Sequence, residues 1–168
     1  MILHMNQQLT PEVVVRSYGR EDLVAVESLW IALYQHQKDH GMLLEVSPSS
    51  FKDWAASMTM ALGRFSCLFA AEEKLRPIGF LAGRIRSLPP YFGGFPVGFI
   101  SEVFVDAAYR GQGVGRRLMA AAIEWFQAQK VRRIELQVVI NNVGARKVYR
   151  EMGWKDELVQ MVWEVDPH

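Results

Sequence analysis

A glycine-rich turn between an apolar strand and a helix constrains this chain more than any other feature. The run VFVDAAYRGQGVGRRL, residues 103–118, begins as an apolar strand, breaks at Asp106 and passes directly into a helix. Gly111, Gly113 and Gly115 carry no side chain where backbone N–H groups open that helix. Such a helix start attracts anions, because unpaired amides and the positive end of the helix dipole point at them. The turn therefore predicts a phosphate site.

The spacing of these glycines excludes the two best-known phosphate loops. A P-loop needs GxxxxGK followed by Ser or Thr, and no such run occurs in the chain. A dinucleotide fingerprint, GxGxxG, would need its third glycine where Arg116 or Leu118 stands. What remains is the spacing RxxGxG, formed by Arg110, Gly113 and Gly115.

A second segment, NVGARKVYREMGW, begins at Asn142. Asn142, Ala145, Tyr149 and Gly153 stand at relative positions 0, 3, 7 and 11, which at about 100° per residue follow one side of a helix. Asn142 also suits a helix N-cap, and Gly153 suits the residue after a helix end. Taken alone, the segment predicts a capped helix whose tyrosine packs in the core.

Together the two segments resemble the signatures of the GNAT superfamily of coenzyme A-dependent N-acetyltransferases. RxxGxG is similar to its pyrophosphate loop, and the second segment is similar to its NxxAxxxYxxxG motif followed by an aromatic residue. The second begins about 30 residues after the first, with a helix and a strand between them. The resemblance is strong over residues 97–154 and rests on element order elsewhere. It implies an acetyltransferase that transfers acetyl from acetyl-CoA to a primary amine by direct attack in a ternary complex.

The resemblance also implies a cosubstrate site made mostly of backbone. Val103, Phe104 and Val105 would pair with the pantetheine arm of acetyl-CoA as an added strand. Asn142 would hydrogen-bond to the same arm. The pyrophosphate would be held by Arg110, Gly111, Gln112, Gly113, Val114, Gly115 and Arg116.

Acetyl transfer needs a neutral amine, and deprotonating a lysine-type amine of pKa about 10.4 at pH 7 costs about 4.6 kcal/mol. Glu102 is the candidate base, because it lies in the strand that leads to the glycine turn. Some family members carry the base on the following strand, where this chain has Gln137; Glu135 is the reserve. Tyr149 is the candidate acid, or a hydrogen-bond donor to the leaving thiolate.

Length and composition limit the domain count, the partners and the cellular compartment that we expect. The chain has 168 residues, 50% of them hydrophobic, which predicts one domain over 1–168, with 1–10 as candidates for disorder. A net charge of +1 gives no electrostatic case for nucleic acid. The absence of a signal peptide or an 18-residue apolar stretch predicts a cytoplasmic protein that does not bind membranes.

Cys67 lies in an apolar run and predicts a buried small hydrophobe. His36 and His40 lack a third ligand, so no metal is expected.

The resemblance and the hydrophobic periodicity together predict an α+β fold with a mixed, mostly antiparallel, twisted sheet of six to seven strands and about four helices. The expected helices cover residues 20–38, 48–62, 113–130 and 143–152. The expected strands cover residues 13–16, 65–71, 78–86, 97–106, 134–139 and 158–165.

The acceptor is left open by the sequence. In GNAT proteins it is shaped by segments that correspond here to residues 33–54 and 88–98, and it is a polyamine, an amino acid, an aminoglycoside-like compound or a protein amine. The candidate assembly is a homodimer. Two other functions stay open: a catalytically silent module that binds or senses acyl-CoA, and an α/β interaction domain whose glycine turn is only structural.

Overall fold

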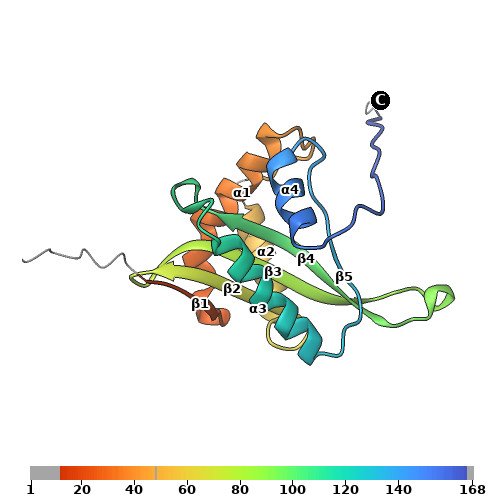
Figure 1. The fold of residues 1–168 in the computed structure, drawn as a ribbon, viewed down its shortest axis with the longest axis horizontal. Helices are drawn as coiled ribbons and strands as arrows, with labels where there is room; N and C mark the ends of the chain where they lie inside the picture. The colour runs from red at the N-terminus through yellow and green to blue at the C-terminus, as the bar shows by residue number, and fades with distance from the viewer. Residues whose placement is uncertain (1–11, 48, 166–168) are drawn as a thin grey trace, which may run out of the picture.

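The computed structural model describes residues 12–47 and 49–165 and contains one sheet of five strands, in the order β1-β2-β3-β4-β5 (Figure 1). The strands are β1 (Val13–Ser17), β2 (Ser66–Glu73), β3 (Arg76–Ser87), β4 (Pro96–Val105) and β5 (Ile134–Leu136). The first four are antiparallel neighbours, and β5 pairs with β4 in parallel. The expected mixed sheet is confirmed, but the expected six to seven strands are wrong.

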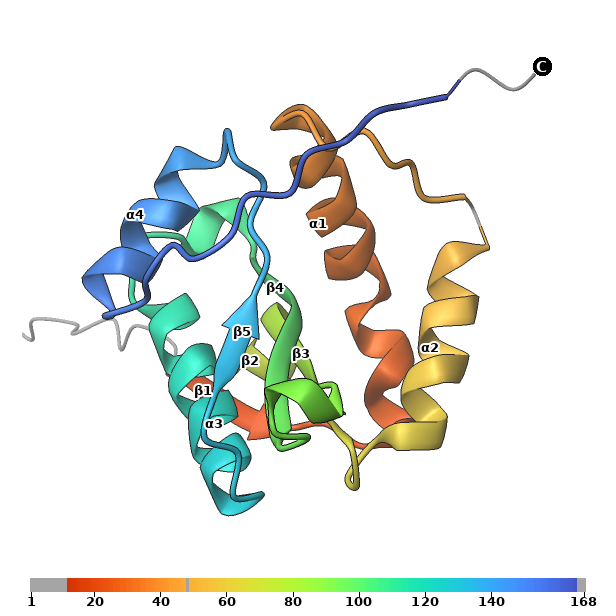
Figure 2. The ribbon, with the colours of Figure 1, turned by 90° about the vertical axis from the view of Figure 1, so that its right-hand side faces the viewer.

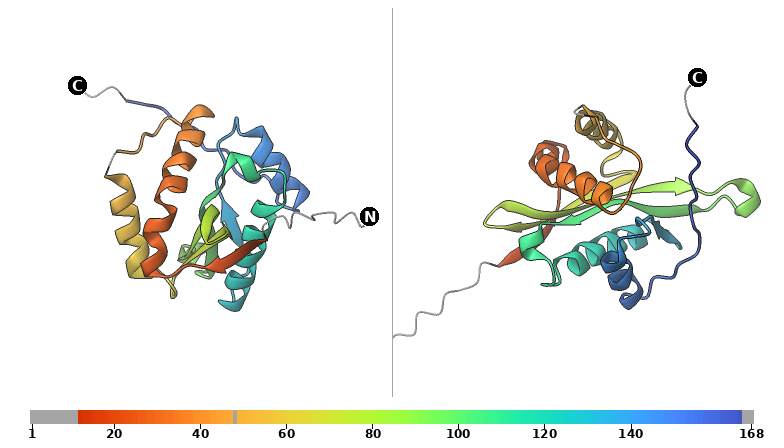
Figure 3. Two further views of the ribbon diagram at one scale, coloured as in Figure 1. Left: turned by 90° about the vertical axis from the view of Figure 1, so that its left-hand side faces the viewer. Right: turned by 90° about the horizontal axis from the view of Figure 1, so that it is seen from above.

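Helices cover both faces of this sheet. Figure 2 shows α1 (Glu27–Asp39) and α2 (Ser50–Ala61) on one face and α3 (Val114–Ala128) and α4 (Val143–Glu151) on the other. Figure 3 shows the same layers from above. None of the helices in the described ranges is long and apolar enough to span a bilayer.

Alternation along the strands divides the core into two clusters. On β3, Phe80 and Ala82 pack toward α1 and α2, whereas Leu81 packs toward α3. Phe126 of α3 is fully buried and closes the second cluster against the sheet. Burying each such side chain stabilises the fold by about 1.5–3 kcal/mol. Cys67 is buried, and desolvation raises the pKa of its thiol to about 12, so it packs as the expected small hydrophobe.

The helix expected over residues 20–38 is divided into a 3-10 helix and an α-helix. Arg20–Val26 is a 3-10 helix, and the α-helix begins only at Glu27. Leu23, Val26 and Leu29 are all buried and three residues apart. That spacing fits three residues per turn as well as it fits an α-helix, so periodicity could not separate the two. The helix expected from Pro48 begins at Ser50, and Pro48 and residues 1–10 lie outside the described residues.

The expected closing strand at 158–165 is wrong. Its apolar, β-branched residues favour a strand, but β5 ends at Leu136 instead of the expected Val139 and offers little edge to pair with. The segment crosses the chain beyond β5 without joining the sheet (Figure 2), and Gln137 donates a side-chain hydrogen bond to Gln160 at 3.5 Å. Six large apolar side chains here are 60–91% exposed: Leu158, Val159, Met161, Val162, Trp163 and Val165.

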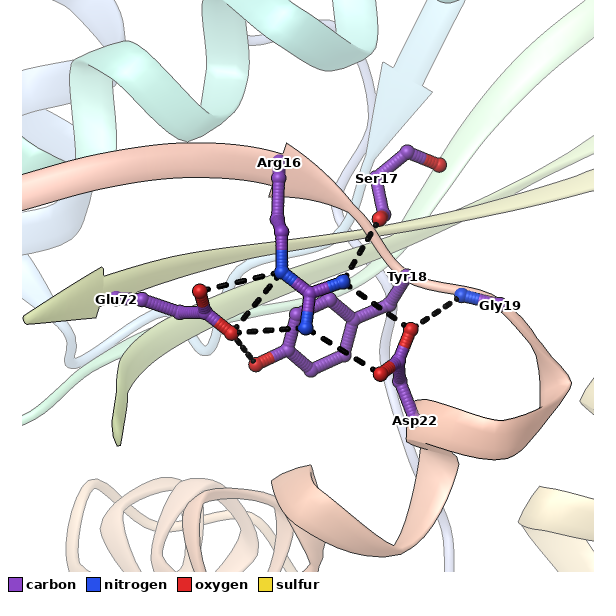
Figure 4. A network of polar contacts seen from close by, with 6 residues as sticks. All are labelled: Arg16, Ser17, Tyr18, Gly19, Asp22 and Glu72. Carbon is purple, nitrogen blue, oxygen red and sulfur yellow. Dashed lines mark hydrogen bonds and ion pairs between the residues drawn. The ribbon is translucent and has the colours of Figure 1, made fainter. Parts of the chain in front are cut away.

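A polar network fastens β1 and β2 to the turn that follows β1 (Figure 4). The hydroxyl of Tyr18 donates to Glu72 at 2.5 Å, and Arg16 donates to both Glu72 and Asp22. Burial raises the pKa of Glu72, but the hydrogen bonds from Tyr18 and Arg16 outweigh this effect and lower it overall. The ionised carboxylate therefore contributes stability that is lost only when the pH falls through this lowered pKa.

Candidate active site

Strand β4 carries one extra residue, Ser101. Glu102 lies opposite Ala82 and Ile100 lies opposite Gly83, so Ser101 has no partner of its own on β3. Such a bulge interrupts the alternation of side chains and bends the strand. Ile100 packs in the cluster beneath α3, whereas Glu102 contacts α1 on the other face. The bulge thus directs the predicted base toward α1 and α2.

Glu102 is a buried carboxylate, only 6% exposed. The hydroxyl of Tyr34 donates to its Oε1 at 3.2 Å, and the hydroxyl of Ser101 donates to its Oε2. Burial raises the pKa of Glu102 above its usual range, against the opposing effect of hydrogen bonds from Ser101, Trp54 and Tyr34 and of the positive charge of Arg84. A carboxylate in this state holds a proton more firmly than one in water, which suits a base.

A pocket of about 200 Å³ opens beside this carboxylate. It lies between α2 and the strands β3 and β4. Its lining is half apolar and half polar: Trp54, Ser57, Met58, Ala61, Phe65, Ser66, Arg84, Ile85, Ser101 and Glu102. Of the expected acceptor segments, only Trp54 contributes to it, and β3 and the end of α2 supply most of the rest.

The edge of β4 that faces β5 is open after the bulge. β5 pairs only with Gly98, Phe99 and Ile100, whereas β4 continues to Val105. Over residues 101–105, β4 is paired with β3 on its other side alone. An open strand edge presents backbone donors and acceptors, so it accepts an extended ligand that carries amides. This is the edge for which pairing of Val103–Val105 with pantetheine is predicted.

The glycine turn follows the end of this edge and has the predicted order of strand, turn and helix. Gly111 and Gly113 have φ of +75° and +79°, a left-handed conformation that favours glycine. No heavy atom lies within 4 Å of where a Cβ would stand at either position. The described part of the chain supplies no acceptor to the backbone N–H groups of residues 111–116. These amides at the start of α3 therefore fit a diphosphate.

The polar side chains of the turn are engaged within the protein. Arg110 donates from Nε to the carbonyl of Val105 at 3.0 Å, and Gln112 donates to the carbonyl of Ala108 at 3.1 Å. Arg116 forms an ion pair with Glu151 of α4 at 2.8 Å. Val114 is buried in the core, and Gly115 lies against Val105. These contacts shape the turn, which leaves the backbone amides to meet the anion.

Helix α4 places Asn142 and Tyr149 as the second motif predicts. Asn142 is the N-cap, and its Oδ1 accepts from the N–H of Ala145 at 3.1 Å. Tyr149 packs near Trp154 in the cluster beneath α3, and burial raises the pKa of its phenol to about 12. Glu102 thus lies on the α1 face of the sheet and Tyr149 on the α3 face, so the two side chains do not touch each other.

The reserve base is less suited to its role. Glu135 is ion-paired with both Arg86 and Arg133. Burial raises its pKa, but hydrogen bonds from these two arginines outweigh this effect and lower it overall. Gln137 is exposed on the surface. These contacts favour Glu102 as the base.

Sequence reasoning missed the neighbours of Glu102, which are Tyr34, Trp54, Arg84 and Ser101. Tyr34 fits the apolar face of the first helix, and nothing local signals that its hydroxyl reaches β4. Arg84 is the one signal available, as a cation within an apolar strand. His36 and His40 lie together with ring centroids 4.3 Å apart. No group of three metal-ligating side chains occurs within residues 12–47 and 49–165.

Comparison with known proteins matches residues 23–154 to the acetyltransferase (GNAT) family. The chain belongs to this family. An uncharacterised N-acetyltransferase of Methanocaldococcus jannaschii is 33% identical over 95 residues, which are 56% of this chain and 42% of that protein. A mycothiol acetyltransferase of Amycolatopsis mediterranei is 37% identical over 87 residues, 51% of this chain and 29% of that protein. The GNAT chain spans less than half the length of these two relatives.

The GNAT fold is also seen in solved structures. The aminoglycoside N-acetyltransferase AAC(6')-Iy in complex with CoA has a TM-score of 0.75 and 18% sequence identity, over 93% of this chain and 96% of that chain. At this identity the likeness establishes the shared fold, and it confirms the fold class predicted from the two motifs.

Proposed function

We propose that this protein is an acetyl-CoA-dependent N-acetyltransferase that acts on a small primary amine within a ternary complex. One observation carries the proposal: an open strand edge runs from the unpaired amides of the glycine turn to the buried carboxylate of Glu102. The glycine-turn end of this edge suits the diphosphate of acetyl-CoA, and the Glu102 end suits its thioester. The name of the mycothiol acetyltransferase relative supports a small-molecule acceptor.

In this proposal the cosubstrate lies along β4. Backbone groups of Val103, Phe104 and Val105 pair with the pantetheine arm, and the amides of residues 111–116 hold the diphosphate. The remaining amide donors of Asn142 are free to bind the arm, because only its Oδ1 is engaged in the cap. The acetyl group then lies beside Ser101 and Glu102, at the mouth of the pocket.

The chemistry is a direct transfer. The amine nitrogen forms a bond to the thioester carbon, the carbon–sulfur bond breaks, and Glu102 receives the proton that the amine loses. Proton transfer from a phenol of pKa about 12 to a thiolate of about 8.5 is uphill by about 5 kcal/mol. Tyr149 therefore acts as a neutral hydrogen-bond donor to the leaving sulfur, and the thiolate takes its proton from solvent later.

The direct test is release of free thiol from acetyl-CoA across a panel of amines, run beside calorimetry with coenzyme A. We expect saturable binding of coenzyme A and thiol release with at least one amine. Binding without thiol release for any amine would contradict the enzyme and favour the silent module. Absence of both would leave an interaction domain with a structural turn.

A further inference from the structure

Arg84 is an exposed cation that forms no ion pair within the described ranges, although its positive charge acts on the buried carboxylate of Glu102. It lines the same pocket as Glu102 and lies over the ring of Phe99, 5.4 Å from its centroid. Within the described ranges no carboxylate forms an ion pair with it. Arg86, two residues further along the same strand, lies over the same ring but is paired with Glu135.

The register of the sheet places the two residues near each other. Glu102 lies opposite Ala82, which is two positions from Arg84 on β3. Two strand positions correspond to about 7 Å between backbone positions, and both side chains line the pocket, so one small molecule can touch both. The pocket of about 200 Å³ is smaller than the roughly 300–1,000 Å³ of sites for drug-sized ligands.

We propose, on the basis of the function proposed above, that the acceptor is a small amine that also carries a carboxylate, such as a free α-amino acid. Its carboxylate pairs with Arg84, and its amine lies beside Glu102. A guanidinium holds a carboxylate through two parallel hydrogen bonds, which fixes the amine in position. The side chain of the acceptor lies against Met58 and Phe65, which also line the pocket. A polyamine would bring a second positive charge against Arg84, so the pocket discriminates against it.

The test compares leucine, leucinamide, 3-methylbutylamine and spermidine as acceptors in the thiol-release assay. Leucinamide and 3-methylbutylamine lack the carboxylate of leucine. We expect kcat/KM to favour leucine over both by at least about tenfold, the factor that corresponds to 1.4 kcal/mol. Arg84→Gln should abolish this preference, mainly by raising the KM for leucine. Arg84→Glu should shift the preference toward spermidine.

Arg86→Gln is the matched control, because it removes the same charge from the same strand but from a side chain already paired with Glu135. It should keep the preference for leucine. A preference for leucinamide or spermidine in the natural protein, or an unchanged preference in Arg84→Gln, overturns the inference while leaving the acetyltransferase intact. Absence of thiol release with all four amines and with the wider panel instead contradicts the proposed function itself.

Discussion

The buried carboxylate of Glu102, the proposed base, would serve catalysis at a cost to stability. Burial raises its pKa, so the folded state prefers the protonated form. For a group whose pKa is raised on folding, the stabilising effect is complete below the unfolded pKa of about 4.3 and is lost as the pH rises through the folded pKa. At pH 7 the ionised side chain therefore weakens the fold.

Glu102→Gln should therefore raise the melting temperature at pH 7 and remove most of the turnover. Each kcal/mol corresponds to about 2–4 °C for a protein of this size. The natural protein should lose kcat/KM at low pH, with a midpoint above the ordinary glutamate value, as Glu102 becomes protonated. Thermal unfolding and pH-rate profiles measure both effects.

Glu135→Gln provides the contrast, because that carboxylate has a lowered pKa and two ion-pair partners. It should lower the melting temperature at pH 7 and leave the acid side of the pH-rate profile in place. Loss of turnover in Glu135→Gln with retention in Glu102→Gln would reverse the assignment of the base.

At the scale of elements, the glycine turn works because a left-handed backbone leaves open space before α3. A Cβ at Gly113 would meet no heavy atom within 4 Å, so its main effect on the fold is the strain of a positive φ. The same side chain would occupy the space in which we propose that the diphosphate binds. A substitution at Gly113 can therefore separate an effect on coenzyme A affinity from an effect on the stability of the fold.

Gly113→Val should abolish measurable coenzyme A binding in calorimetry and destabilise the fold by about 1–2 kcal/mol. Gly63→Val is the matched control, since Gly63 has a φ of +85° and equally open space, but lies just after α2, away from the glycine turn. The control should lose similar stability and keep its affinity. Equal loss of affinity in both variants would argue against the phosphate assignment.

The elements that sequence could predict are those whose causes are local. The turn before α3 and the capped helix α4 depend on glycines, a cap and a periodic face within a few residues of one another. The bulge at Ser101 and the short β5 depend on pairing between distant strands, which leaves no local mark. The pocket was missed for the same reason, because Trp54, Arg84 and Glu102 meet only after the sheet has formed.

At the scale of the whole molecule, the exposed segment 158–165 is unusual. Six large apolar side chains are exposed within eight consecutive residues of a segment that joins no strand (Figure 1), whereas monomeric proteins rarely expose large contiguous apolar patches. The short β5 is the last strand of the described sheet and has an unpaired edge. A second copy of the chain can cover both features at once, which supports the expected homodimer.

We expect the protein to be a dimer in light scattering at micromolar concentration, and a variant with Met161→Lys and Trp163→Glu to be a monomer. Leu75→Lys is the control, because Leu75 is 88% exposed but stands alone in the hairpin turn between β2 and β3. The control should remain dimeric. A natural protein that is monomeric at every concentration would contradict the prediction.

The surplus residue in β4 has a further consequence. Ser101 stands at the point where β4 and β5 part, since their last shared pair is Ile100 with Leu136. Because a bulge bends its strand, this single extra residue prevents β4 and β5 from pairing over a greater length. The opening proposed for the thioester thus depends on the number of residues in β4 rather than on side-chain identity, so we expect an insertion or deletion at position 101 to change access more than any substitution there.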